Sequence, residues 1–64
     1  MHLIAEFPRY RIDTAKVATA DGKIEYKTII FNKDRKRVEA TYTHILEESA
    51  RKFHERCVKE AENI

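Results

Sequence analysis

The central part of the chain, residues 15–44, alternates between apolar and polar side chains on either side of an Asp21-Gly22 pair. Such a period of two is typical of strands that bury one face. Asp-Gly favours a two-residue turn, because a type I′ turn needs a positive φ at both of its central residues. We therefore expect a hairpin in which Thr19 lies opposite Ile24.

A second reversal is expected at residues 33–35, which are charged and follow the second strand. If these three residues form the loop, Val38 falls beside Ile30. Shifting this register by one residue would bring Arg37 beside Ile30 and disrupt the apolar face, because neighbouring residues of a strand point to opposite sides. The resulting antiparallel meander has strands at residues 9–19, 23–31 and 36–43.

The N-terminal run Leu3–Phe7 favours a strand and ends at Pro8, the one proline of the chain. Proline has no amide hydrogen to donate to a neighbouring strand. Pro8 is therefore expected at a sheet edge, a bulge or a bend. Leu3–Phe7 would then add a short edge strand to the meander or fold back over one of its faces.

The C-terminal third changes to a helical period, since apolar residues recur there at spacings of three and four. This apolar face comprises Leu46, Ala50, Phe53, Cys57, Ala61 and Ile64. Thr43 is the expected N-cap. Three acidic-to-basic pairs at i,i+4 support the helix: Glu47–Arg51, Glu48–Lys52 and Glu55–Lys59. The same period extends back to about Asp34, so a longer helix competes with the third strand, which Thr41 and Tyr42 favour.

Together these elements predict one domain, residues 1–64, of the α+β class. We expect a three-stranded antiparallel meander, with or without a short N-terminal edge strand, packed on one long C-terminal amphipathic helix. The helix should cover Val17, Ile24, Tyr26, Ile30, Val38 and Tyr42. The other face keeps an apolar cluster that one helix cannot reach: Tyr10, Ile12, Ile29 and Phe31. This cluster either binds a partner or is covered by Leu3–Phe7.

Composition limits the classes of protein that the chain can represent. Of its 64 residues 38% are charged, yet the formal net charge is only +2. The single cysteine excludes an intramolecular disulfide and fits a reducing compartment. No run approaches the roughly 20 apolar residues of a membrane span. We expect a soluble, cytoplasmic protein with no membrane partner, whose small core favours self-association.

The predicted sheet is more basic than the predicted helix. Residues 1–42 hold nine Lys or Arg against six Asp or Glu, a net +3, and residues 43–64 hold four against five, a net −1. The residues that could contact nucleic acid are Arg9, Arg11, Lys16, Lys27, Arg35, Lys36 and Arg37. A solubilising turn that protects a strand edge is the other interpretation of this basic cluster.

The order of elements from Arg9 to about Glu62 resembles the arm-site DNA-binding domains of phage-type integrases and the related plant AP2 domains. The resemblance lies in architecture, a three-stranded meander followed by one helix. It implies a sheet that reads the major groove of DNA while its turns grip the phosphate backbone.

The residue types that bind metals or carry catalysis do not form a recognisable site. His54 and Cys57, spaced i,i+3, could share a metal ion, but no further ligands follow at matching spacing. His44 with Glu47 could perform acid–base chemistry, although the chain has no Gly-rich phosphate loop or nucleophile elbow. We expect no enzymatic activity, no metal, no cofactor and no small-molecule substrate.

Two functions remain open. In the first, the protein is a small non-enzymatic interaction module, a homodimer that acts as an adaptor or as an inhibitor of a larger protein through the apolar sheet face. In the second, it is a small accessory DNA-binding protein of the kind found in phages and other mobile elements. We favour the first, because the apolar cluster is the better-defined surface feature.

Overall fold

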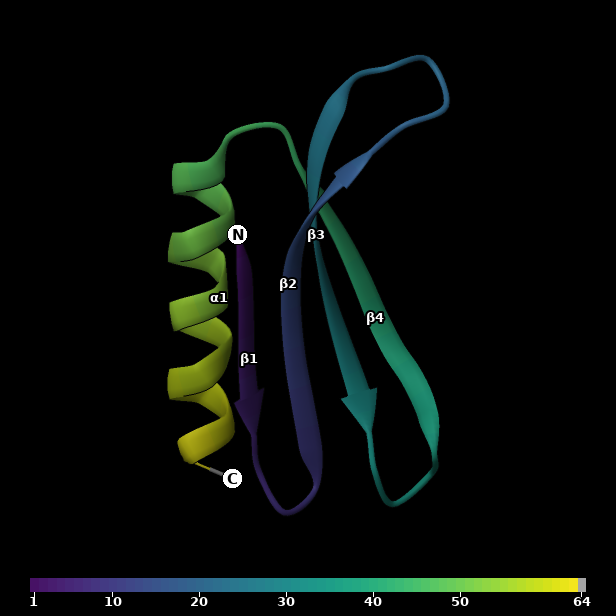
Figure 1. Cartoon of the computed structure of the whole chain (residues 1–64). Coiled ribbons are helices and arrows are strands. Elements are labelled where there is room, and N and C mark those ends of the chain that lie inside the picture. Colours follow the sequence, from purple (N-terminus) through teal and green to yellow (C-terminus); the bar gives the residue numbers. More distant parts are fainter. Residues whose placement is uncertain (64) are drawn as a thin grey trace.

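The computed structural model describes residues 1–63, which form four strands and one helix. The strands are β1 (His2–Glu6), β2 (Tyr10–Ala18), β3 (Ile24–Asn32) and β4 (Arg37–His44), and the helix is α1 (Glu47–Glu62). The strands make one antiparallel sheet in the order β1-β2-β3-β4, and α1 packs against it (Figure 1). The predicted α+β class is confirmed, and the sheet has four strands because the N-terminal segment joins it.

β1 pairs with β2 along its whole length, with Ile4 opposite Asp13. In the bend between them, the amide of Phe7 donates a hydrogen bond to the carbonyl of Tyr10 over 2.8 Å. Pro8, which has no amide hydrogen, occupies this bend as expected. β1 therefore extends the sheet sideways, and the alternative in which the N-terminal run folds back over a sheet face is wrong.

The β2–β3 hairpin has a three-residue loop, Ala20–Gly22, instead of the predicted two-residue turn. The amide of Thr19 donates to the carbonyl of Lys23 over 2.8 Å, and the amide of Gly22 donates to the carbonyl of Thr19 over 3.0 Å. Within residues 1–63, only Gly22 and Lys36 have a positive φ, 84° and 54°. A turn followed by one left-handed residue is the common geometry of three-residue hairpin loops.

The extra loop residue shifts the register of β2 by one and reverses its faces. Ala18 lies opposite Ile24, and Ile12 lies opposite Ile30. The even-numbered residues of β2 therefore face α1. Val17, expected beneath the helix, lies on the opposite face of the sheet.

β4 is a strand, as predicted over the longer helix, and it contains a β-bulge. Ala40 pairs with Ile30, but Val38 pairs with Phe31, so Glu39 is the extra residue. The predicted pairing of Val38 with Ile30 is therefore wrong. The bulge moves Val38 to the face of the sheet opposite α1.

Asn32 organises the turn before β4 and the bulge after it. Its side-chain oxygen accepts a hydrogen bond from the amide of Arg35 over 3.0 Å. Its side-chain nitrogen donates to Glu39 Oε1 over 2.7 Å. The turn spans residues 33–36, one more than predicted, because Asn32 pairs with Arg37.

α1 begins at Glu47, and its N-cap is Leu46, which has an extended backbone and makes no side-chain cap hydrogen bond. The predicted N-cap, Thr43, lies within β4, so that prediction is wrong. The buried residues of α1 are Ala50, His54 and Cys57. The predicted apolar face is confirmed at Ala50 and Cys57, while Ile64 lies outside the described residues.

Two of the three predicted helical ion pairs are confirmed. Glu47 and Arg51 are 3.7 Å apart, and Glu48 and Lys52 are 3.1 Å apart. The third, Glu55–Lys59, does not form in the part of the chain that the structure describes.

Candidate interaction surface

The sheet face that α1 leaves uncovered, the open face, presents its side chains in rows across the strands. Membership follows from the strand register and from the alternation of side chains along each strand. The rows are Glu6, Arg11, Phe31 and Val38; Ile4, Asp13, Ile29 and Thr41; His2, Ala15, Lys27 and Thr43; and Val17 with Glu25. β1 and β2 supply most of the charged side chains, whereas β3 and β4 supply most of the large apolar ones.

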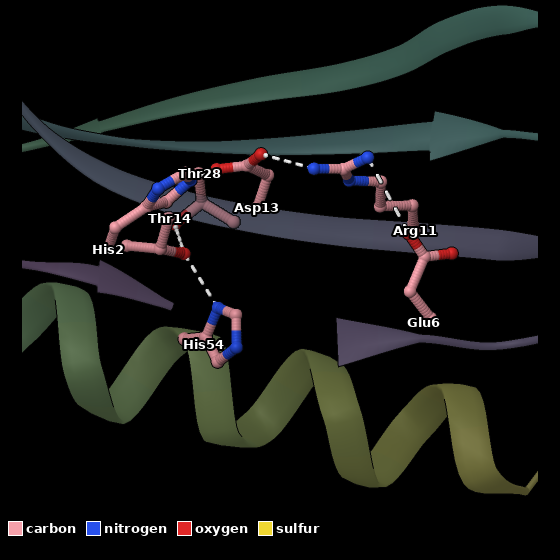
Figure 2. Close-up of polar contacts among 7 residues, drawn as sticks. All are labelled: His2, Glu6, Arg11, Asp13, Thr14, Thr28 and His54. Carbon is pink, nitrogen blue, oxygen red and sulfur yellow. Dashed lines mark hydrogen bonds and ion pairs between the residues drawn. The ribbon is translucent and has the colours of Figure 1, made fainter. Parts of the chain in front are cut away.

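An ion-pair chain crosses the β1–β2 half of the open face (Figure 2). His2 Nε2 lies 2.7 Å from Asp13 Oδ1, and Arg11 Nη2 lies 3.4 Å from Asp13 Oδ2. Arg11 Nη1 also lies 3.5 Å from Glu6 Oε1, and Lys33 Nζ lies 2.5 Å from Glu6 Oε2. The hydrogen bond from Lys33 lowers the pKa of Glu6. Because water reaches these groups, the pairs orient the charges more than they stabilise the fold.

The β3–β4 half of the open face has an apolar end, formed by Ile29, Phe31 and Val38, while Glu25 and Lys27 lie toward its other end. Ile29 is 37% exposed, Val38 is 53% exposed, and Phe31 between them is half-buried. Where this half meets the ion-pair chain, the surface forms a hollow of about 310 Å³. Its lining residues are Arg11, Asp13, Ile29 and Phe31. The open face thus combines an apolar surface with an ordered charged border, as protein-binding surfaces do.

Of the four residues predicted to bind a partner, two lie on the open face. Ile29 and Phe31 are there, but Ile12 is only 2% exposed and packs beneath α1. Tyr10 lies on the helix side as well, where it lines a small pocket of about 110 Å³ with Ile12 and residues of α1. Grouping all four on one face is therefore wrong, because the three-residue loop turns the even positions of β2 toward α1.

Sequence reasoning missed three apolar residues of the open face: Ile4, Val17 and Val38. Ile4 is 48% exposed, and its position follows from alternation once β1 is accepted as part of the sheet. Leu3 and Ala5 then share the helix side. Val38 reaches the open face only through the bulge, which no local pattern indicates.

The residues predicted to bind nucleic acid do not share one face. Lys27 lies on the open face, whereas Lys16 lies opposite Tyr26 on the helix side. Arg11 belongs to the ion-pair chain, and Arg9 Nε lies 3.8 Å from Asp34 Oδ2. Their charges are therefore divided between faces or paired with carboxylates.

The other basic residues lie at the β3–β4 turn. The amide of Lys33 donates to the carbonyl of Arg9 over 2.8 Å, which confirms the predicted proximity of that turn to Arg9. Arg35, Lys36 and Arg37 are exposed. None of these three forms an ion pair within residues 1–63.

Beneath α1, a hydrogen-bonded chain of side chains connects the helix with three strands, which the sequence patterns do not indicate. Thr14 Oγ1 lies 2.7 Å from His54 Nδ1 and 2.8 Å from Thr28 Oγ1 (Figure 2). Thr28 Oγ1 lies 3.4 Å from His44 Nε2. No buried side-chain nitrogen or oxygen atom of the described residues lacks a hydrogen-bond partner. The chain therefore satisfies the polar groups that α1 encloses.

Burial also sets the chemistry of these groups. It lowers the pKa of His54, because the charged imidazole would lose its hydration. It raises the pKa of the Cys57 thiol, because the thiolate would lose its hydration. The hydroxyl beside His54 belongs to Thr14, which is 0% exposed, so no substrate atom can reach it. In residues 1–63, no three His, Cys, Asp or Glu side chains converge into a group that could hold a metal ion.

Two further observations concern membrane-spanning helices and the similarity of the chain to known proteins. α1, the helix of the described residues, is too short and too polar to cross a membrane. Comparison of the chain with protein families, curated proteins and solved structures found no match.

Proposed function

We propose that this protein is a small non-enzymatic interaction module that forms a homodimer through the open face. In this assembly, Ile29, Phe31 and Val38 of one copy pack against the same residues of a second copy. The dimer then acts as an adaptor or as an inhibitor of a larger protein. The enclosed position of the Thr14 hydroxyl supports a role without catalysis.

The observation that carries the proposal is the balance between buried and exposed apolar side chains. The buried hydrophobic residues are Ile12, Ala50 and Cys57. Within residues 1–63 the exposed large hydrophobic residues are Ile4, Ile24, Ile29, Val38, Tyr42, Ile45 and Leu46. Of these, Ile4, Ile29 and Val38 lie on the open face. A domain that buries so little apolar surface gains stability when a second copy covers what it leaves exposed.

The dimensions of the chain support the same proposal. Its accessible surface is 4692 Å², compared with about 4,300 Å² expected for a compact monomer of this mass. Its radius of gyration is 12.0 Å, compared with about 11 Å expected for this length. A molecule of one sheet and one helix exposes more surface than a compact monomer, because one face of its sheet is not covered. A second copy on the β3–β4 half of that face would stack the two sheets over part of their area, with one helix on each outer side.

The division of the open face into two halves favours a second copy as the occupant. A two-fold axis beside β3 can place the apolar end of one copy on that of the other, because an isologous interface uses the same surface of both subunits. The ion-pair chain then lies outside this contact. Its charges stay in water, where they require no compensation by the partner.

Light scattering after size exclusion tests the proposal, with Phe31→Glu as the variant and Ile45→Glu as the control. Ile45 is 73% exposed and lies between β4 and α1, away from the open face. The unmodified chain and Ile45→Glu should have the mass of a dimer, and Phe31→Glu that of a monomer, because a carboxylate buried against apolar side chains is strongly disfavoured. A monomeric mass for the unmodified chain, or a dimeric Phe31→Glu, would refute the proposal.

DNA binding is the second candidate function, and the exposed cations Arg35, Lys36 and Arg37 at the β3–β4 turn favour it. The open face does not add to this charge, since Glu6, Asp13 and Glu25 on it oppose Arg11 and Lys27. Titration of duplex DNA at two salt concentrations tests this function. Binding that weakens steeply with salt and is lost in Arg37→Glu would support it, because released counterions dominate such affinity. Absence of binding at low salt would exclude it.

A further inference from the structure

A second surface lies on the other side of the sheet, between the edge strand β4 and the flank of α1. It is a shallow groove of about 440 Å³, separate from the open face. Its lining residues are His44, Ser49, Lys52, Phe53 and Arg56. Phe53 forms its apolar floor, with its ring centroid 4.6 Å from that of Tyr42 and 5.0 Å from that of His44.

The two flanks of α1 differ in charge. The flank beside β4 carries Lys52, Arg56 and Lys59 together with Glu48 and Glu60, a net charge of +1. The opposite flank carries Glu47, Arg51, Glu55 and Glu62. Lys52 pairs with Glu48 over 3.1 Å, whereas Arg56 forms no ion pair with any described residue. Of the two cations that line the groove, Arg56 is therefore the one that has no ion-pair partner within residues 1–63.

β4 contributes His44, its last residue, to the lining of the groove and is an edge of the sheet. β3 pairs with one side of β4, so the backbone amide and carbonyl groups on its other side have no strand partner within residues 1–63. The bulge lies at Glu39, so residues 40–44 present a regular extended edge. Such an edge binds a further extended segment through backbone hydrogen bonds, while alternate side chains of that segment enter the adjacent groove.

We propose that the β4–α1 groove binds an acidic segment of a partner protein in an extended conformation. The segment adds a fifth strand beside β4, and its carboxylates reach Lys52 and Arg56. Because alternate side chains of a strand share one face, the methylene groups of these same acidic side chains pack on Phe53. A peptide fits better than a nucleic acid, because the repeat of the β4 backbone groups matches that of another strand. The site lies on the helix side of the sheet and does not depend on the proposed dimer.

Nuclear magnetic resonance titration of the full chain with synthetic peptides tests the proposal. The probe is a capped peptide that repeats Val-Glu four times. The control probe repeats Val-Lys four times, and a thymidine octanucleotide represents single-stranded nucleic acid. The Val-Glu peptide should shift the amide signals of residues 40–44 saturably and slow their hydrogen exchange, because new backbone hydrogen bonds protect amides.

Two charge-reversal variants of the same helix provide the matched comparison. Arg56→Glu should weaken binding of the Val-Glu peptide about tenfold, because it replaces an attraction at the groove with a repulsion. Arg51→Glu makes the same change in charge on the opposite flank and should leave the affinity within about twofold of the unmodified chain.

Four outcomes would overturn the proposal. They are the absence of shifts in residues 40–44, equal binding of the Val-Lys peptide, tighter binding of the oligonucleotide, and equal losses in Arg51→Glu and Arg56→Glu. The titration is repeated on Phe31→Glu, which should keep the affinity of the unmodified chain. Loss of binding in that variant, with an unchanged fold, would show that a single copy does not form the groove.

Discussion

On the face of the sheet that α1 covers, Thr14 and Thr28 are fully buried and hydrogen-bonded, whereas on the open face Ile29 and Val38 remain exposed to water. The covered face is thus partly polar, and the uncovered face is partly apolar. A buried hydrogen bond adds only about 1 kcal/mol of net stability, but an unpaired buried group costs more. The polar chain therefore specifies where α1 sits, while the open face retains apolar surface available for association.

Truncating one isoleucine on each face should give the largest difference in the free energy of unfolding. Ile12→Ala removes a buried side chain and should lower the free energy of unfolding by about 2–5 kcal/mol. Ile29→Ala, on the open face, should cost less than about 1 kcal/mol at concentrations where the chain is monomeric. Urea denaturation measures both values.

Ile12→Val, with an expected loss of about 0.5–1.5 kcal/mol, keeps this comparison measurable if Ile12→Ala does not fold. Equal losses at positions 12 and 29 would mean that both faces are buried alike in the monomer. A loss in Ile29→Ala that grows with protein concentration would instead support burial of the open face in a dimer.

Removing one hydroxyl group from each face should give the next largest difference in the free energy of unfolding. Thr14→Val keeps the shape of the side chain but leaves His54 Nδ1 without its partner, at an expected cost of about 1–3 kcal/mol. Thr41→Val is the control on the open face and should change stability by no more than about 0.5 kcal/mol. If the two variants are equally stable, the hydrogen-bonded chain does not hold α1 in place.

A smaller change in stability should follow from the titration of His54 on the covered face. Burial lowers the pKa of His54 in the folded state below its ordinary value of 6.5, so the unfolded chain binds a proton first as the pH falls. The stability that the chain gains from keeping His54 neutral is complete above pH 6.5 and is lost as the pH falls toward the folded-state pKa of His54. Asp13 and Glu55 act in the opposite direction by favouring the charged imidazole.

Urea denaturation between about pH 7.5 and pH 5 measures this dependence in the unmodified chain and in His54→Gln. The variant should be less sensitive to pH, since it lacks the titrating group. Identical pH profiles for the two proteins would contradict the assignment to His54.

The smallest loss of stability is expected when the ion-pair chain of the open face is broken. Asp13→Asn removes the carboxylate that faces both His2 and Arg11, which lie partly in water. We expect a loss below about 1 kcal/mol, and less at high salt. Denaturation at two salt concentrations checks this value. A larger loss would mean that this half of the open face is shielded from water.

Local sequence patterns were sufficient for the two faces of β3, for the middle of α1 and for β4 as a strand, but not for the register of β4. In β3, strong alternation assigned Ile24, Tyr26 and Ile30 to the helix side, as the structure has it. In α1, apolar residues three and four positions apart can share only one face of a helix. The candidate site was predicted in part, since Ile29 and Phe31 lie on strand β3 with its clear pattern.

The face of β2 was not predictable in the same way. Its two sides are almost equally polar, Ile12 and Thr14 on one and Asp13 and Val17 on the other, so alternation alone leaves the orientation open. The prediction relied on the turn at Gly22, where Asp-Gly is compatible with both two-residue and three-residue loops. A difference of one residue reversed every side chain of the strand.

The number and type of most elements thus follow from short-range chemistry, namely the period of the apolar residues, the one glycine and the one proline. Tertiary contacts decided which side of β2 faces α1, through the packing of Ile12 and the hydrogen bond from Thr14 to His54, forty residues away in sequence. They also decided the bulge at Glu39, which Asn32 holds from the neighbouring strand. Contacts between distant segments leave no periodic signal in either segment, so only the folded chain reveals which side chains form the open face.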